Sequence, residues 1–334
     1  MWPSRRMRLR QQRKSRNNDL IRMVGKTTME NVIETNQLTR KYGKLDAVHD
    51  LTISVPNGSV LAFLGPNGAG KTTTIRMLMN IIEPTSGSSS VLGVDSRRLG
   101  PAQLQQIGYV AADQRMPDWM TIRDFLAYCR PMYPTWDDGF AQSLLKQYAL
   151  PPDQKLANLS RGMRMKAMLI SSLAYRPRLL ILDEPFAGLD PLVRDEFVQG
   201  ILELTEQDRW TIFISSHDIE EVERLADRIC IVNEGRLCEN ESVESLQARF
   251  RLVQVMVRDG DVLPAKLPAH WLVAEQQGNM LRFVDSRYSE ANGEKFWRSQ
   301  LPASAQIEAK TMSLREIFLA LARTYRPVTK EERP

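Results

Sequence analysis

The stretch that decides the fold is Gly65-Pro66-Asn67-Gly68-Ala69-Gly70-Lys71-Thr72, which follows the pattern Gly-x-x-x-x-Gly-Lys-Ser/Thr. An apolar run at Val60–Leu64 precedes it and predicts a buried strand, and a helix is expected from about Gly70 to Asn80. Glycines let successive backbone N–H groups turn toward an anion, and the positive end of the following helix points at the same place. The segment therefore predicts a loop that binds the phosphates of a nucleotide.

The side chains of this loop add chemistry to the backbone. Lys71 would bring a full positive charge to the β- and γ-phosphates, and the Thr72 hydroxyl is suited to ligate Mg²⁺. A chance glycine-rich turn is the plain alternative, but a random match in a chain of this length has odds on the order of 1%. The residues expected to contact ATP here are Gly65, Pro66, Asn67, Gly68, Ala69, Gly70, Lys71, Thr72 and Thr73.

A second segment, Leu179-Leu180-Ile181-Leu182-Asp183-Glu184-Pro185, supplies two adjacent carboxylates at the end of an apolar strand. Strand geometry points neighbouring side chains in different directions. Asp183 is then placed to hold the Mg²⁺ shell, directly or through water, and Glu184 to polarise the water that attacks the γ-phosphate. A solvated loop after a strand would also end in acids, but the phosphate loop elsewhere in the chain favours the catalytic interpretation.

Composition and hydrophobic periodicity divide the chain into three parts. Residues 1–28 are polar, basic and aperiodic and are expected to be disordered, while residues 29–245 show the pattern of an α/β domain. A third strand is expected at Trp210–Ile214, and the helical pattern between about 115 and 175 predicts a helical subdomain inserted into the core.

The composition changes again beyond Ser245, where residues 246–334 predict a small α+β domain of about 85 residues. Ser313 and Glu316 have the spacing of a capping box that opens a helix running through Ala322. The strands expected in this part are Leu252–Val257, Trp271–Glu275 and Met280–Val284, with a turn at Gly278-Asn279 between the last two.

Charge and composition exclude several classes of protein. The net charge of +5 comes from residues 1–28, which hold nine Lys or Arg and one acid, so the remainder of the chain carries −3. A general nucleic-acid surface is therefore not expected. The basic segment either attracts anionic lipid or precedes a true start at Met29. Three scattered cysteines provide no disulfide framework or zinc site, and the sequence shows neither a signal peptide nor a span of about 20 apolar residues.

Taken together, the motifs resemble those of the nucleotide-binding subunit of ABC transporters, over about residues 30–245. Leu159-Ser160-Arg161-Gly162-Met163 stands at the place of that family's signature loop, normally Leu-Ser-Gly-Gly-Gln. The resemblance assigns Asp183-Glu184 to the Walker B pair, Ala187-Gly188-Leu189-Asp190 to the D-loop, His217 to the switch histidine, and Tyr42 to the aromatic stacked on adenine. It implies catalytic roles for Glu184 and His217, with His217 hydrogen bonded to the γ-phosphate.

The resemblance also implies partners. In this family Ser160, Gly162 and Asp190 act in trans, on the nucleotide held by a second copy, so a head-to-tail homodimer is expected. A separate integral-membrane subunit is expected as well, with this chain at the cytoplasmic face of a bacterial plasma membrane. The Ser313–Leu319 segment and the Ile107 to Arg123 stretch look similar to ABC-2-type exporter subunits, which implies export of a drug, antibiotic peptide or envelope component.

Departures from the family pattern leave two points open. The signature loop has Arg161 for its first glycine and Met163 for its glutamine. Ala112 occupies the place of the usual Q-loop Gln or Glu, so Gln114 or Asp113 would have to serve as the Mg²⁺ ligand.

The sequence leaves four alternatives to export. Import is one, and a nucleotide-gated scaffold with negligible turnover is another. A ribosome-associated ATPase would normally carry two nucleotide domains. A DNA-repair ATPase would insert a long coiled coil, whereas only about 90 residues without heptads separate Lys71 from Ser160.

Overall fold

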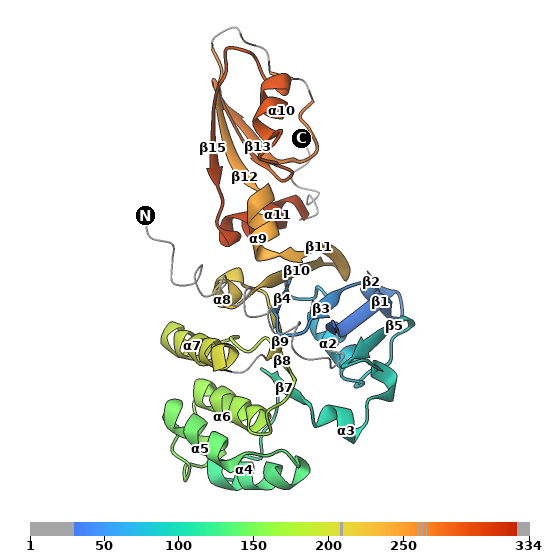
Figure 1. The fold of residues 1–334 in the computed structure, drawn as a ribbon, viewed down its shortest axis with the longest axis vertical. Helices are drawn as coiled ribbons and strands as arrows, with labels where there is room; N and C mark the ends of the chain where they lie inside the picture. The colour runs from blue at the N-terminus through green and yellow to red at the C-terminus, as the bar shows by residue number, and fades with distance from the viewer. Residues whose placement is uncertain (1–29, 208–209, 259–260, 262, 265, 326–334) are drawn as a thin grey trace, which may run out of the picture. The chain divides into compact units, whose positions relative to one another are not determined.

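The computed structural model describes residues 30–207, 210–258, 261, 263–264 and 266–325, and every structural statement below concerns these residues. The basic segment 1–28, expected to be disordered, lies outside them. The described part holds a core domain from β1 to β11, followed by a C-terminal antiparallel sheet with its own helices (Figure 1).

A six-stranded sheet in the order β11-β10-β4-β9-β8-β7 forms the centre of the core domain. All neighbours in it are parallel except β10 and β11. The strands are β4 (Val60–Leu64), β7 (Ile107–Ala111), β8 (Leu179–Asp183), β9 (Thr211–Ser216), β10 (Arg228–Asn233) and β11 (Arg236–Ser242). The continuous apolar runs of β4 and β8 are buried along their whole length, as expected of parallel strands covered on both faces. The strands expected at 60–64 and 179–182 are confirmed, and the one expected at 210–214 begins one residue later.

A second, antiparallel sheet packs beside the first and was not foreseen from the sequence. Its strands are β1 (Asn31–Tyr42), β2 (Leu45–Leu51), β3 (Ser54–Pro56), β5 (Ser86–Val91) and β6 (Val94–Asp95). They pair in the order β2-β1-β5-β6, and β3 also pairs with β1. The polar sequence Ser-Gly-Ser-Ser-Ser-Val of β5 gives no hydrophobic alternation to read.

Helices surround the central sheet. The helix after the phosphate loop is α2 (Lys71–Leu78), and the inserted helical region contains α4 (Ile122–Cys129), α5 (Asp138–Gln147) and α6 (Arg161–Leu173). Residues 115–121 of the predicted helical region form a loop before α4. The remaining core helices and short 3₁₀ turns are η1 (Ser96–Arg98), α3 (Pro101–Leu104), η2 (Arg130–Met132), η3 (Leu156–Asn158), α7 (Pro191–Gln207) and α8 (Ile219–Val222). None of the described helices combines the length and apolar character needed to cross a bilayer.

The C-terminal sheet has the order β13-β14-β12-β15 and is entirely antiparallel. Its strands are β12 (Arg251–Met256), β13 (Trp271–Gln277), β14 (Met280–Asp285) and β15 (Gln306–Thr311), and its helices are α9 (Val243–Arg249), α10 (Gly293–Gln300) and α11 (Leu314–Tyr325). The predicted capping box is confirmed, because the Ser313 backbone N donates to Glu316 Oε2 at 2.7 Å and the Glu316 N donates to Ser313 Oγ at 3.2 Å. The turn at Gly278 is confirmed too, with φ +56°.

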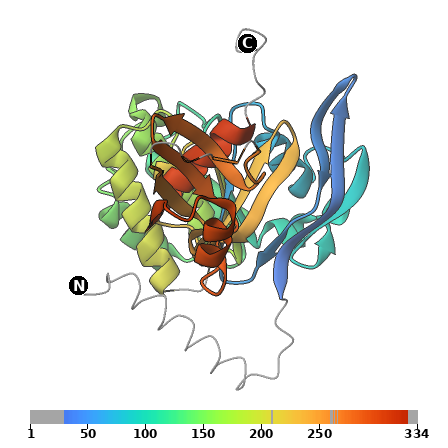
Figure 2. The same ribbon diagram turned by 90° about the horizontal axis from the view of Figure 1, so that it is seen from above.

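Two apolar clusters show how this sheet is attached. One cluster lies inside the C-terminal sheet and includes Val253, Phe283 and Trp297. The other is the large cluster of the core domain, and it extends into α9 through Leu246 and into α11 through Ile317. Figure 1 shows α9 and α11 between the C-terminal sheet and strands β10 and β11 of the core domain, and Figure 2 gives the same ribbon seen from above. The boundary expected between residues 245 and 246 falls within α9 and stays a prediction.

Candidate functional site

The loop between β4 and α2 can be made only with glycine at its tight points. Gly68 and Gly70 have φ of +82° and +94°, a region that side chains disfavour. A Cβ on Gly65 would lie 2.3 Å from the Val232 carbonyl oxygen, and one on Gly70 would lie 2.3 Å from that of Ala47. Because α2 begins directly at Lys71, its free N–H groups end beside this loop, and the site fits a phosphate.

Lys71 is buried and held on three sides. Its Nζ donates to the carbonyl oxygens of Gly65 at 2.6 Å and Pro66 at 3.0 Å. The same Nζ lies 3.0 Å from Glu184 Oε1. The ammonium is therefore fixed between the glycine loop and the acid at the end of β8, where it can neutralise a phosphate and where it already pairs with Glu184.

Asp183 ends β8 and is buried at 4% exposure. Its Oδ1 accepts hydrogen bonds from Ser215 Oγ at 2.7 Å and Thr72 Oγ1 at 3.2 Å. Burial raises the pKa of this carboxyl, the two hydroxyl donors lower it, and the neighbouring charge of Glu184 adds to the rise. A carboxylate and a hydroxyl in contact form the hard oxygen set that Mg²⁺ prefers, so these residues fit the ion.

Glu184 adopts a left-handed backbone with φ +50°, which is uncommon for a residue with a side chain. Its backbone N donates to Ser215 Oγ at 2.9 Å, which helps to hold this conformation. Its carboxylate contacts two side chains. Oε1 pairs with the Lys71 ammonium, and Oε2 lies 2.7 Å from Nδ1 of His217. Strain of this kind is common where a side chain must be aimed at a reacting centre.

His217 follows β9, and its position depends on two neighbours that the sequence did not reveal as functional. The Ser216 hydroxyl donates to the Asp218 carbonyl oxygen at 3.0 Å and is in contact with the Glu221 carboxylate. Glu221 is 3% exposed and lies 3.6 Å from Arg194 Nη2 of α7. Burial raises the pKa of the Glu221 carboxyl. The Ser216 hydrogen bond and the positive charge of Arg194 lower this pKa, but the net result is still a rise. In the sequence, the only sign of these supporting residues is the pair Ser215-Ser216 directly before His217.

The residues expected to act in trans form a separate cluster at the starts of α6 and α7. Ser160 caps α6 by accepting from the Met163 N at 3.2 Å, and Asp190 caps α7 by accepting from the Val193 N at 3.0 Å. Gly162 is packed so closely that a Cβ there would lie 2.6 Å from Val193 Cγ1. Among the described residues, none of the hydrogen bonds of Ser160, Gly162 or Asp190 reaches the phosphate loop.

Tyr42 lies at the end of β1 with its ring 46% exposed and the Arg40 guanidinium 4.7 Å from the ring centroid. The strand that pairs with it, β2, reaches the phosphate loop, because the Ala47 carbonyl packs against Gly70. An exposed ring on this hairpin is available to a flat ligand.

The predicted metal ligand Gln114 is exposed, and its Oε1 accepts from the Ala111 N at 3.5 Å. The loop it belongs to is tied to Asp183 by the backbone instead, since the Ala112 N donates to the Asp183 carbonyl oxygen at 3.1 Å. Asp113, the other candidate, pairs loosely with Arg76 at 3.8 Å. The structure thus brings Lys71, Thr72, Asp183, Glu184 and His217 together and leaves Gln114 bonded within its own loop.

Comparison with known proteins finds matches to ATP-binding proteins of ABC transporters. A family model described as ABC transporter matches residues 48–187. A model described as an AAA domain, putative AbiEii toxin, type IV toxin–antitoxin system, matches residues 152–223. The bacitracin transport ATP-binding protein of Bacillus licheniformis is 36% identical over 225 residues, which is 67% of this chain and 74% of that protein.

Other relatives carry related names. The ABC transporter ATP-binding protein YtrB of Bacillus subtilis is 30% identical over 69% of this chain and 78% of its own length. A probable multidrug ABC transporter ATP-binding protein of Escherichia coli is 32% identical over 69% of this chain and 40% of its own. Among solved structures, an ATP-binding subunit of an ABC transporter superposes with a TM-score of 0.59 at 26% identity, covering 65% of this chain and 92% of that one.

Proposed function

This chain belongs to the ATP-binding subunits of ABC transporters, and we propose that, as an ATPase of that family, it drives an exporter whose membrane channel is a separate polypeptide. The observation that carries the catalytic part is the meeting of Lys71, Asp183, Glu184 and His217 around the glycine loop. A cation for the phosphates, a buried acid for a metal and a second acid for water are the parts that phosphoryl transfer to water needs.

The residues divide the work of hydrolysis among them. The backbone N–H groups of residues 65–73 other than Pro66 and the Lys71 ammonium bind the β- and γ-phosphates of ATP, and Tyr42 stacks on the adenine. Thr72 and Asp183 would hold Mg²⁺, with Gln114 as a third candidate, and the ion supplies neutralisation of phosphate charge. An incoming γ-phosphate competes with Glu184 for Lys71, because both anions are attracted to one ammonium.

Glu184 is the base that orients and polarises the attacking water, and His217 holds its carboxylate through the 2.7 Å bond. The two acids have different partners, since Asp183 accepts from Thr72 and Ser215 whereas Glu184 pairs with Lys71 and His217, so they serve different atoms. His217 also donates to the γ-phosphate once nucleotide is bound. The contact between Ser216 and Glu221 fixes the backbone directly before His217 and so helps to position the histidine.

A second copy of the chain completes the site. Ser160, Gly162 and Asp190 lie at two adjacent helix N-termini, which together favour an anion. Since their bonds stay within their own cluster, we propose that they serve the nucleotide of the facing subunit, in a twofold head-to-tail dimer.

Export of a drug, antibiotic peptide or envelope component is supported by the similarity to a bacitracin transport protein and a probable multidrug transporter protein. Import has a weaker claim, from 32% identity to a carnitine transport protein of Listeria monocytogenes over 64% of this chain. We propose that the chain works at the cytoplasmic face of a bacterial membrane. It would bind its membrane subunit there and would not bind nucleic acid.

Affinity purification from detergent-solubilised membranes tests the partner. We expect an integral-membrane protein to copurify in stoichiometric amount, and the pair reconstituted in vesicles to move substrate away from the ATP side. Accumulation on the ATP side would establish import, and copurification with ribosomes or DNA would overturn the transporter proposal.

A further inference from the structure

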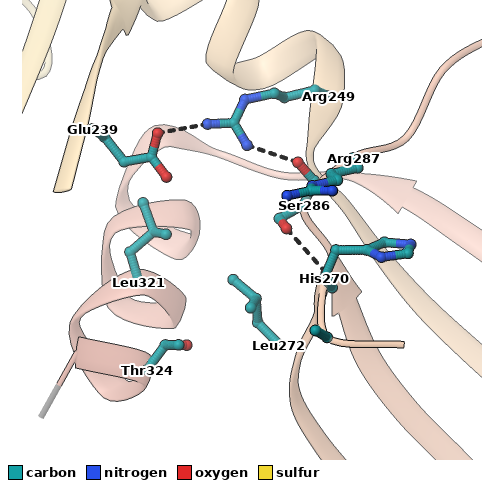
Figure 3. A pocket seen from close by; sticks show the side chains of 9 residues that line it. Glu239, Arg249, His270, Leu272, Ser286, Arg287, Leu321 and Thr324 are labelled. Atoms are coloured by element: carbon teal, nitrogen blue, oxygen red, sulfur yellow. Dashed lines mark hydrogen bonds and ion pairs between the residues drawn. The ribbon is translucent and has the colours of Figure 1, made fainter. Parts of the chain in front are cut away.

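A cavity of about 390 Å³ lies where the C-terminal sheet meets the core domain, well away from the glycine loop. It is lined by Glu239 of β11, Arg249 of α9, Leu272 of β13, Arg287 after β14, and Leu321 and Thr324 of α11 (Figure 3). This volume is within the range of small-molecule sites, roughly 300–1,000 Å³. The cavity is therefore large enough for a ligand of several heavy atoms.

One side of the cavity is a fixed polar frame. Arg249 donates through Nη2 to Glu239 Oε2 and through Nη1 to the Ser286 carbonyl oxygen, both at 2.7 Å. The Ser286 hydroxyl donates in turn to the His270 carbonyl oxygen at 3.0 Å. Figure 3 shows this chain of bonds along the rim, with Leu272 and Leu321 projecting into the opening below it. The cavity thus has a polar edge and apolar walls.

Among the lining residues two arginines, Arg249 and Arg287, face one acid, Glu239, and the acid Glu241 that also pairs with Arg249 lies outside the lining. Arg249 is already matched by Glu239 and Glu241. Arg287 also lines the cavity, and its guanidinium makes no hydrogen bond or ion pair with the described residues. An anionic group would gain a charge-assisted bond there, while an apolar body would cover Leu272 and Leu321.

The backbone beside the cavity is strained, which is an independent sign of function. Val273 directly follows the lining residue Leu272 and has φ +50°. Among the described non-glycine residues with positive φ it is the one with a β-branched side chain, for which this conformation is a genuine outlier. The pairing of β13 with β14 slips between Leu272 and Glu275, and such irregularities re-aim side chains next to binding sites.

Helix α11 connects the cavity to the catalytic site. Its later turns supply Leu321 and Thr324, and its first turn places Arg315 Nη2 2.7 Å from Glu220 Oε1 of α8. Glu220 is adjacent to Glu221, whose carboxylate contacts Ser216 next to His217. Whatever fixes α11 therefore also acts on the segment that holds the histidine.

We propose that this cavity is a regulatory site for a small amphipathic anion, one carboxylate or phosphate on an apolar body, and that its occupation slows ATP hydrolysis through α11 and α8. The slowing follows because a stronger α11–α8 contact keeps His217 on Glu184 and away from the γ-phosphate, to which the histidine must donate once nucleotide is bound. This second part rests on the proposed function, whereas binding itself does not.

Calorimetry on the full chain without nucleotide tests binding, with octanoate as probe and octanamide as its uncharged match. We expect octanoate to bind and Arg287→Ala to weaken it about tenfold, while octanamide binds weakly to both proteins. Thr324→Trp should abolish octanoate binding because the larger side chain fills the mouth of the cavity. Arg323→Trp, at the neighbouring exposed position of α11, is the matched control and should leave binding unchanged. Equal binding of the two probes, or unchanged binding by Thr324→Trp, would overturn the site.

Turnover tests the coupling. Saturating octanoate should lower kcat of the wild type about fivefold, and Arg315→Ala should remove this effect while calorimetric binding persists. An octanoate-bound wild type with unchanged kcat overturns the regulatory part. A chain that hydrolyses no ATP at all refutes the proposed function instead, and the calorimetry still decides the cavity.

Discussion

The guanidinium of Arg161 lies against the backbone of Gly188. A Cβ built at Gly188 would come within 2.4 Å of Arg161 Nη1, 2.8 Å of Cζ and 3.2 Å of Nε, and Gly188 has φ +70°. Arg161 stands where the signature loop of this family usually has glycine, so the departure has a structural consequence. Arg161 joins the segment proposed as the signature loop to the segment proposed as the D-loop within one chain, beside the Gly162–Val193 contact.

Gly188→Ala should therefore reduce ATP turnover at least about tenfold, because the methyl group both displaces Arg161 and strains the left-handed backbone. Nucleotide binding by the monomer should be unchanged, since the glycine loop is not touched. Steady-state kinetics and binding of a fluorescent ATP analogue measure the two effects. The double variant Arg161→Gly/Gly188→Ala should recover part of the turnover, and no recovery would mean that backbone strain alone is responsible.

Glu184→Gln should keep ATP binding and lower hydrolysis by about 10²-fold or more, because the amide is no longer a base for water. ATP would then accumulate between two chains. Gel filtration with light scattering should show a dimer with ATP and a monomer with ADP. A persistent monomer in ATP would contradict the head-to-tail site.

Lys71→Ala should abolish tight nucleotide binding, because the buried ammonium is the cation fixed at the glycine loop by the Gly65 and Pro66 carbonyls. Equilibrium dialysis with labelled ATP provides the measurement. Lys146→Ala, an exposed lysine in the last turn of α5, is the matched control and should bind as the wild type does. Retained binding and turnover in Lys71→Ala would refute the catalytic assignment.

The Glu221→Gln variant should gain stability relative to the wild type as pH rises. Burial raises the folded-state pKa of Glu221 above its ordinary 4.5, so the folded protein binds more protons than the unfolded chain between those two values. Wild-type stability from this group is present below pH 4.5 and is lost as pH rises through the raised pKa.

The glutamine variant lacks this loss and keeps a partner for the Ser216 hydroxyl. The difference in thermal midpoint, variant minus wild type, should grow as the pH rises above 4.5 and through the raised pKa of Glu221. Glu220→Gln, a substitution of the same kind at an exposed neighbouring residue, is the matched control. A pH-independent difference for Glu221→Gln would show that its charge is fully compensated by Arg194.

The catalytic half-site could be predicted from sequence because its parts are local. Val60–Leu64 and Leu179–Leu182 are unbroken apolar runs, and the residues proposed to carry the chemistry follow them directly in the sequence. Strands β5 and β15 were missed for the opposite reason, since their sequences are polar and show no readable hydrophobic alternation. Their pairing partners, not their own sequences, make them strands.

Residues that act through tertiary contact also escaped prediction. Glu221 sits in an acidic stretch that looks like a solvated helix face, yet the fold buries it against Ser216 and Arg194. The role of Arg161 depends on Gly188, which is distant in sequence and brought near by the packing of α6 on α7. Neither contact leaves a periodic trace along the chain.

The attachment of the C-terminal sheet at both ends has an evolutionary consequence. The chain leaves the core domain through α9 and returns to it through α11, and Leu246 and Ile317 belong to the core's own apolar cluster. Strands β12 to β15 are therefore an insertion between two anchored helices rather than an appendage on a hinge. Exchange between relatives should succeed when the cut points lie just outside those helices, at Phe250 after α9 and at Met312 before α11. Removal of everything after Ser245 would take away Leu246 and Ile317 and expose the apolar surface of the core that now packs against them.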